Sequence, residues 1–211
     1  NKFIVIPPIY TDTKIEEYLG TDSTQIDVLK GSNIKLIFEF DTSLESSWML
    51  VDNQRVFLEI ADNIIHGDFM FNDKIKLRIY CLNKNMIPNL NPIQFSFNKI
   101  EDFSPSITIN TPEKEFEINE SYKIYMNFNI TDDYGIDDVW LEYNIVSPGF
   151  STDNPINQIS FKDRLTEKEK ELNIVYDWDI DNLGILMGDE IHFWIVAKDN
   201  DPHKTEPIRT D

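Results

Sequence analysis

The chain carries two copies of one alternating unit. The stretch DKIKLRIYCLNKNMIPNLNPI begins at Asp73, and the stretch DEIHFWIVAKDNDPHKTEPI begins at Asp189. Each opens on an acid, alternates apolar residues with others, breaks into Asn- and Asp-rich turn residues and ends on Pro-Ile. Alternation with period two is typical of a β-strand with one buried face. Two copies of such a unit favour a module built for spacing or binding over a single catalytic cleft.

The two copies extend upstream of these stretches. The strand-like run Lys35–Phe40 precedes Trp48, and the matching run Lys123–Phe128 precedes Trp140. The segment IEDFSP, around residues 101–105, supplies charge, a turn-forming residue and a proline between the copies. We therefore predict two domains, 1–102 and 103–211, each of ordinary single-domain size.

Strand signals dominate both halves. Alternating or apolar runs occur at 34–40, 56–60, 75–81, 93–97, 107–109, 122–130, 139–146, 174–178 and 191–197. Alanine is rare, while Phe, Ile and Tyr, which favour strands, are abundant. Short strands without crossover helices predict an all-β fold of two tandem immunoglobulin-like β-sandwich domains, with Trp48 and Trp140 as core residues between the sheets.

Helical signals are few. Thr13–Leu19 is long enough for one or two turns, and Leu165–Leu172 is the best helical window, with Thr166 as its cap. The second window is equally compatible with a charged loop. No run of 18 apolar residues is present, so we expect no transmembrane segment in this stretch of chain.

The charge balance restricts the classes of partner. The chain has 19 basic and 38 acidic residues, a formal net charge of −19, and most of the excess lies in the second half. Such a surface repels phosphate, so we expect no nucleic-acid partner. A basic partner or divalent cations remain open, as does a simple role of the acidity in solubility. The single cysteine, Cys81, excludes an intramolecular disulfide and is interpreted as a buried thiol.

Acidic turn residues are the sharpest candidate site. Asp132 and Asp133 follow one predicted strand, and Asp199, Asn200 and Asp201 follow another. Strand ends of a sandwich gather at its poles, and carboxylate and amide oxygens are ligands that suit Ca²⁺. The alternative is that these side chains hold tight turns by accepting hydrogen bonds from their own backbone. Calcium is therefore the only cofactor that we consider.

Aromatic residues offer a second kind of site. Trp194 alternates with Phe193, so one of the two points away from the core, and an exposed Trp on a sheet can stack on a sugar or a partner. Tyr80 and Tyr125 are further candidates, and the alternative is that these rings pack against the protein itself. The sequence contains no recognisable catalytic, phosphate-binding or zinc motif. We therefore do not expect an enzyme.

Several phrases in the second half occur together in a known group of proteins. Thr131–Ile145 reads TDDYGIDDVWLEYNI, and a later stretch reads DIDNLGILMGDEIHFWIVAKDNDPHK. This order resembles the ectodomains of large bacterial envelope proteins of unknown function, which are anchored by N-terminal transmembrane helices and often encoded beside MoxR-type ATPases. The residues that match the group's two turns are Asp132, Asp133, Tyr134, Gly135, Leu183, Gly184, Gly188, Asp189, Ala197, Asp199 and Asn200.

The resemblance covers the second half well and the first half loosely, through GSNIKLIFEF and HGDFMFNDKIKLRIY. It implies a periplasmic or extracellular location in a bacterial envelope, a membrane anchor elsewhere in the full-length protein, and other envelope proteins as partners. The expected function is a non-catalytic structural or protein-binding module. The alternative is a calcium- or carbohydrate-binding, adhesin-like module.

Overall fold

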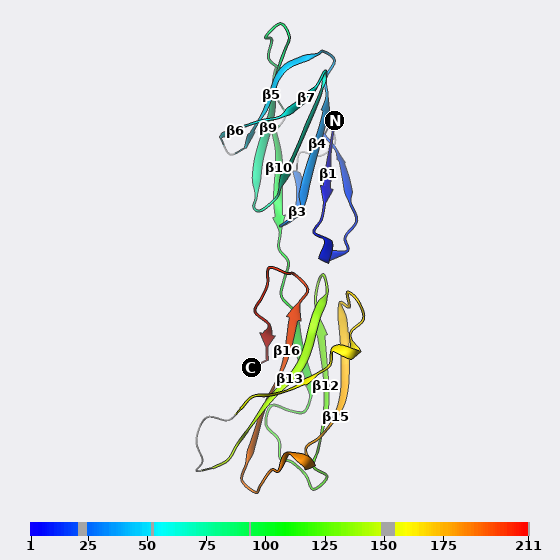
Figure 1. Ribbon diagram of the computed structural model, residues 1–211, viewed down its shortest axis with the longest axis vertical. Coiled ribbons are helices and arrows are strands. Elements are labelled where there is room, and N and C mark those ends of the chain that lie inside the picture. The colour runs from blue at the N-terminus through cyan, green and yellow to red at the C-terminus, as the bar shows by residue number, and fades with distance from the viewer. Residues whose placement is uncertain (21–24, 52, 93, 149–154, 211) are drawn as a thin grey trace. The chain divides into compact units, whose positions relative to one another are not determined.

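The computed structural model describes residues 1–20, 25–51, 53–92, 94–148 and 155–210. The chain divides into two compact units, Asn1–Asp102 and Phe103–Asp211, coloured blue to green and green to red in Figure 1. Each unit is an all-β sandwich of two sheets, as predicted. Among the described residues, no helix is long and apolar enough to cross a membrane.

The first unit pairs two five-stranded sheets. One has the order β2-β1-β4-β8-β7, with β1 at Lys2–Ile6, β2 at Glu16–Leu19, β4 at Asn33–Glu39, β7 at Glu59–Ala61 and β8 at Ile64–Met70. The other has the order β3-β10-β9-β5-β6, with β3 at Gln25–Leu29, β5 at Leu44–Val51, β6 at Gln54–Phe57, β9 at Ile75–Asn83 and β10 at Gln94–Ile100. All neighbours are antiparallel except β3 and β10, which run parallel.

Alternation builds the core of the first unit. In β4, Ile34, Leu36 and Phe38 are buried while their neighbours are half-buried or exposed. Phe3 from β1 meets the rings of Phe38, Phe95 and Phe97 edge to face, at centroid distances of 5.2, 4.7 and 5.2 Å. Such pairs add about 0.5–1.5 kcal/mol each beyond the burial of their area. Cys81 is buried among these strands, which confirms its interpretation as a structural thiol.

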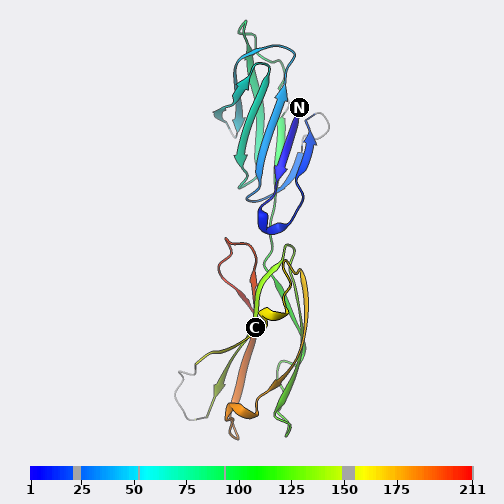
Figure 2. The ribbon, with the colours of Figure 1, turned by 45° about the vertical axis from the view of Figure 1, so that its right-hand side comes forward.

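The second unit has a three-stranded and a four-stranded sheet, seen as separate layers in Figure 2. The first has the order β11-β12-β15, with β11 at Ser106–Thr111, β12 at Lys123–Thr131 and β15 at Glu171–Asp179. The second has the order β14-β13-β16-β17, with β13 at Ile136–Val146, β14 at Asn157–Ser160, β16 at Glu190–Asp199 and β17 at Ile208–Arg209. Short 3-10 turns lie at Ile9–Thr11, Lys162–Arg164 and Asp181–Leu183.

The topology explains the sequence repeat. In the first unit β1-β4-β8 and β6-β5-β9-β10 follow the same order as β11-β12-β15 and β14-β13-β16-β17 in the second. The acid-led stretches become β9 and β16, and Pro92 and Pro207 stand just before β10 and β17. Proline has no N–H and therefore suits the position that leads into a strand. The two copies thus share a fold as well as a pattern.

The prediction that Trp48 and Trp140 fill the cores is wrong. Trp48 lies between the buried Ser47 and Met49, so the pleat points it outward, where it stacks on Tyr80 at 5.8 Å. Trp140 is likewise only half-buried, between the buried Val139 and Leu141. A tryptophan that the repeat did not single out occupies the core of the second unit.

That residue is Trp178 in β15, which is 2% exposed. Its ring meets Tyr143 at 4.8 Å and Phe193 at 6.3 Å, so it joins the two sheets. Ile124, its partner across β12, is also buried. Trp178 therefore holds the place expected for Trp140.

Neither helical window forms a helix. Residues 16–19 of the first window are strand β2. In the second window the left-handed backbone of Lys168, at φ 61°, interrupts helical geometry, and Thr166 bonds the Glu169 side chain across a turn. The backbone N–H groups of Asp132 and Ile136 donate to the carbonyls of Lys170 and Glu169. These bonds support the charged-loop alternative.

We predict that Trp178→Ala lowers the unfolding free energy of the second unit by about 3–5 kcal/mol, because it leaves a large cavity between the sheets. The matched change Trp140→Ala removes a half-buried ring and one hydrogen bond, and we expect roughly 1–2 kcal/mol. Urea unfolding followed by circular dichroism measures both. Equal losses for the two variants would contradict this assignment of the core tryptophan.

Candidate functional site

The acidic turns meet at one end of the second unit. Ile136, at the start of β13, pairs with Asp199, at the end of β16. The Asn200 side chain donates from Nδ2 to the Tyr134 carbonyl at 3.1 Å, and its backbone N–H donates to the Gly135 carbonyl at 3.2 Å. The structure therefore brings the turn of Asp132 and Asp133 beside the turn of Asp199, Asn200 and Asp201.

Asp132 closes the first turn. Its Oδ1 accepts the N–H groups of Tyr134 and Gly135 at 2.8 and 2.6 Å, a pattern by which aspartate stabilises turns. Gly135 has φ 145°, and a Cβ atom there would lie 2.5 Å from Nδ2 of Asn200. Burial raises the pKa of the Asp132 carboxyl above its usual value, against the lowering effect of the two backbone bonds.

Asp199 closes the second turn and is 3% exposed. Its Oδ1 accepts the backbone N–H of Asp201 at 2.8 Å, and its Oδ2 lies 2.7 Å from the ammonium of Lys204. Asp201 in turn accepts the N–H of His203 at 2.9 Å. On the other turn, Asp133 accepts the N–H of Phe103 at 3.3 Å through Oδ2. Asp132, Asp199 and Asp201 thus accept N–H groups of their own turns, whereas Asn200 donates to the neighbouring turn.

The structure also bears on the calcium hypothesis. Within the part of the chain that the structure describes, no three His, Cys, Asp or Glu side chains form a group suited to a metal ion. The ammonium of Lys204 already neutralises the buried carboxylate of Asp199. The alternative, that these residues hold turns, accounts for the backbone N–H groups that Asp132, Asp199 and Asp201 accept.

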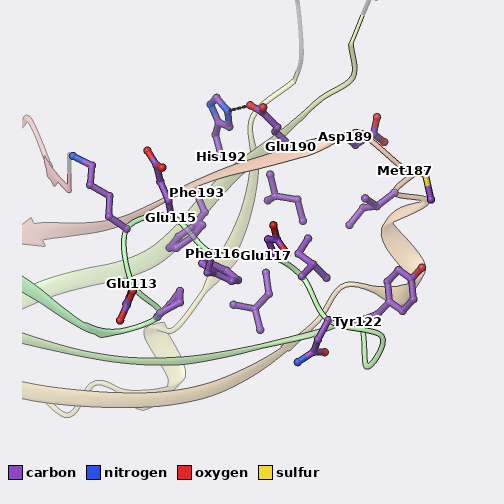
Figure 3. Close-up of a pocket in the computed structure, with 18 of the residues that line it drawn as sticks. Glu113, Glu115, Phe116, Glu117, Tyr122, Met187, Asp189, Glu190, His192 and Phe193 are labelled. Carbon is purple, nitrogen blue, oxygen red and sulfur yellow. Dashed lines mark hydrogen bonds and ion pairs between the residues drawn. The ribbon is translucent and has the colours of Figure 1, made fainter.

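A groove lies where β12 and β16 begin. It encloses about 1550 Å³ between the segment that links β11 to β12 and the segment that leads into β16 (Figure 3). Phe116 and Phe193 pack edge to face within it, with ring centroids 6.5 Å apart. The apolar residues that line it include Ile109, Phe116, Ile118, Ile185, Leu186, Met187, Ile191 and Phe193.

The groove combines uncovered apolar side chains with acids. Phe116 is 41% exposed, Leu186 is 72% exposed and Met187 projects fully into solvent. Around them stand Glu113, Glu115, Glu117, Glu120, Asp189 and Glu190. Bonds from Ser147 and from the Leu186 N–H lower the pKa of Asp189 below its usual value, so this carboxylate stays charged. This surface suits a ligand with apolar anchors and positive charge.

The sequence reasoning did not identify the groove. The available signal was the alternation Glu115-Phe116-Glu117-Ile118, which lies a few residues after β11 and carries the period of a strand. The structure leaves this segment outside any strand and its apolar residues half-covered. These residues therefore have the alternation of a strand without belonging to one.

Trp194 is less available than the sugar-stacking hypothesis requires. The guanidinium of Arg209 lies over its ring, with Cζ 3.8 Å from the ring centroid. Arg209 is held there by Glu142, at 3.2 Å, so the face of this ring belongs to an internal cation–π contact. Tyr80 is stacked on Trp48, whereas Tyr125 is 52% exposed.

Comparison with known proteins adds little to this geometry. No protein-family model matches the chain, and no curated protein matches it. Solved structures that match include the fibronectin(III)-like modules of Clostridium thermocellum CbhA, at 13% identity and a TM-score of 0.28, with 89% of this chain and 86% of that chain covered. A DUF4785 family protein of Legionella pneumophila matches at 8% identity and a TM-score of 0.31, over 83% of this chain and 51% of its own.

Salmonella α-2-macroglobulin matches at 5% identity and a TM-score of 0.33, over 99% of this chain and 14% of its own. These values are too low for any of the three proteins to inform the function of this chain. The sandwich architecture rests on the sheets described above.

We predict opposite effects for two changes at Asp132. Asp132→Ala removes the acceptor of two backbone N–H groups and should cost about 1–3 kcal/mol of unfolding free energy. Asp132→Asn keeps an acceptor without the charge. Because the folded-state pKa of Asp132 is raised, its proton favours the folded state, and wild-type stability falls as pH rises from the ordinary carboxyl range through the folded pKa.

The Asn variant lacks this loss, so it should equal or exceed the wild type at neutral pH. The advantage should vanish in acid, where Asp132 is protonated in both states. Urea unfolding across a pH series measures the difference. A gap that is constant with pH would contradict the raised pKa.

We expect millimolar Ca²⁺ and EDTA to leave the melting temperature unchanged, because Asp199 is paired with Lys204 and Oδ1 of Asp132 accepts two backbone N–H groups. Differential scanning calorimetry is the measurement, with Mg²⁺ as the control for ionic strength. A rise specific to Ca²⁺ that disappears in the variant Asp132→Asn/Asp133→Asn/Asp199→Asn would instead establish the calcium hypothesis.

Proposed function

We propose that this chain is a non-catalytic structural and protein-binding module of a bacterial envelope protein, located outside the cytoplasm. The observation that carries the proposal is the groove of the second unit, where exposed apolar side chains stand within a ring of carboxylates. Partners are expected among other envelope proteins. The bacterial and extracytoplasmic parts of the proposal rest on the resemblance of the two turns in the second unit.

The size and chemistry of the groove favour a protein ligand. Sites for small molecules usually enclose about 300–1,000 Å³ and cover most of their ligand. This groove is larger, and residues such as Met187 and Leu186 project from it into solvent. Large exposed apolar side chains that cluster with polar residues around them mark surfaces that contact other macromolecules.

The groove's charged groups favour recognition over catalysis. Glu190 pairs with His192 at 3.2 Å on the exposed side of β16, and Asp189 is fixed as an anion by the turn that precedes the strand. Catalytic acids and bases are typically desolvated, so that their pKa values move toward neutrality. The acids here remain in solvent, where they steer a basic partner.

One observation favours the alternative, a calcium- or carbohydrate-binding module. Among the described residues Oδ2 of Asp132 is buried and has no hydrogen-bond partner. A cation beside Asp132 would satisfy this oxygen, and the calorimetric experiment above tests that reading directly.

We predict that a photo-crosslinking residue at position 187 captures a specific protein in the organism that makes this chain. The same residue at position 175, exposed on β15 and away from the groove residues, is the matched control. Mass spectrometry identifies the adduct. Neutralising the rim by Glu115→Gln/Glu117→Gln should reduce its yield several-fold, because the partner is expected to be basic.

Equal adducts at both positions, or a yield that the rim variant leaves unchanged, would contradict binding at the groove.

A further inference from the structure

One sheet of the first unit carries a row of aromatic rings on its outer face. Phe57, Trp48 and Tyr80 stand directly opposite one another on β6, β5 and β9 (Figure 1). Their strand neighbours Met49 and Ile79 are buried, so the alternation of the strands directs the rings away from the core. Phe57 is 71% exposed, and the other two rings are half-buried. The row therefore presents aromatic surface to solvent.

Basic side chains border this row. Arg55 lies on β6, and Lys76 and Arg78 lie on β9. Each is two or four residues from a ring of the row, a spacing that places side chains on one side of a sheet. None of the three forms an ion pair with a carboxylate in the described part of the chain. The face is basic in a chain with 38 acidic and 19 basic residues, because β5, β6, β9 and β10 hold a single acid, Glu45.

Among the described residues, two arginines lie over a tryptophan ring, and they differ in what else they contact. Arg209, over Trp194, is held by the carboxylate of Glu142 at 3.2 Å. Arg55 lies over Trp48, with Cζ 4.5 Å from the ring centroid, and has no such carboxylate. The ring therefore fixes the Arg55 guanidinium in place and leaves its charge for an external anion.

A shallow hollow adjoins the aromatic row. It encloses about 370 Å³ and is lined by Leu50, Asn53, Lys76, Leu77, Arg78 and Gln94. Arg78 donates to Oε1 of Gln94 at 2.8 Å. This bond uses one N–H of the guanidinium and leaves the amide N–H groups of Gln94 as further donors. The hollow thus combines two cations with amide side chains.

The hollow and the Arg55 guanidinium lie in one row of the sheet. Arg55, Leu50, Arg78 and Gln94 are successive cross-strand partners on β6, β5, β9 and β10. Arg55 and Arg78 flank Leu50, so their backbones are about 10 Å apart. A ligand that repeats its negative charge along its length can reach both arginines.

We propose that this face binds an acidic polysaccharide. The carboxylate of one sugar enters the hollow beside Arg78 and Lys76, and a second carboxylate pairs with Arg55. Guanidinium groups bind carboxylates through paired hydrogen bonds. The sugar rings contact the aromatic surface of Phe57 and Tyr80, which borders the hollow.

The hollow favours a sugar acid over an acidic peptide. Its volume lies at the lower end of small-molecule sites, which enclose about 300–1,000 Å³. The amides of Asn53 and Gln94 supply acceptors as well as donors, which suits hydroxyl groups. The ionised side chains of an acidic peptide only accept, and would use the donors alone. The site is formed by the first unit without the groove, so its test is separate from that of the protein-binding function.

Hexasaccharides of galacturonic, mannuronic and guluronic acid are the probes, titrated into the whole 211-residue chain by isothermal calorimetry. We expect at least one to bind saturably, with an affinity that salt weakens. Its methyl ester keeps the rings without the charge, and should bind at least about tenfold more weakly. A hexaglutamate peptide has the charge without the rings, and should also bind at least about tenfold more weakly.

The variant Arg55→Gln/Arg78→Gln tests the cations. Both side chains are exposed, so the fold should persist, and binding should weaken about tenfold or more. Lys14→Gln/Lys35→Gln removes the same charge from exposed positions outside this face, and is the matched control that should leave binding unchanged.

The variant Phe57→Ser tests the aromatic row. Loss of this exposed ring should weaken binding about threefold or more. Phe103→Ser changes a ring of similar exposure, 70%, in the second unit and should have no effect. Binding should also change the tryptophan fluorescence of the protein, and Trp48→Phe should remove that signal.

Absence of saturable binding by all three hexasaccharides would overturn the proposal. Equal binding of hexaglutamate would overturn it in favour of an acidic protein as the ligand. Equal losses in the arginine variant and the lysine control would reduce the interaction to net charge and also reject the site. Crosslinking at position 187 reports on the second unit, so it leaves the protein-binding function standing whichever of these results is found.

Discussion

The structure depends on one constraint. Each strand of a sandwich must bury the side chains of one face and hydrogen-bond the backbone groups along its edges. Alternation satisfies the face, because every second side chain enters the core. Edges require a neighbouring strand, since unpaired N–H and carbonyl groups invite another chain. In the first unit β9 is flanked by β5 on one edge and, along residues 75–78, by β10 on the other. In the second unit β16 pairs with β13 along its length, and on its other edge β17 pairs with Val196 and Ala197 while Thr210 bonds Ile195.

This difference shows which parts of the fold the sequence could predict. The long alternating runs of β4, β9, β12 and β16 were predictable because each buries one face. The strands that were not among the predicted runs include short edge strands such as β2 and β17, and also the interior strands β1, β5 and β8. The error at Trp48 and Trp140 concerns the face of a strand rather than its position. The size of the tryptophan side chain suggested a core position. Because the neighbouring Met49 and Val139 point into the core, the alternation of the strand directs Trp48 and Trp140 outward.

The sequence predicted the acidic turns but not the groove. Turn residues after two strands of one sandwich are expected to meet, and Asp132 and Asp199 do lie in turns that bond each other through Asn200. The groups that contact each carboxylate could not be predicted from the sequence. Lys204 contacts Asp199, and the amides of Tyr134 and Gly135 contact Asp132, only once the turns have folded. The groove could not be recognised from the sequence, because its walls come together only in the folded second unit.

The two copies share a topology but differ in how fully corresponding residues are buried. In the first, Phe95 and Phe97 complete the core from within the chain, so its flank offers a neighbour little apolar surface. In the second, Phe116 and Ile118 keep the spacing of buried strand residues while remaining partly in solvent, and the acids that alternate with them prevent a wholly apolar edge. Charges on an edge strand discourage indiscriminate pairing with like chains. Residues 113–118 thus carry apolar side chains that alternate with acids, which joins the charge asymmetry of the sequence to the groove of its second sandwich.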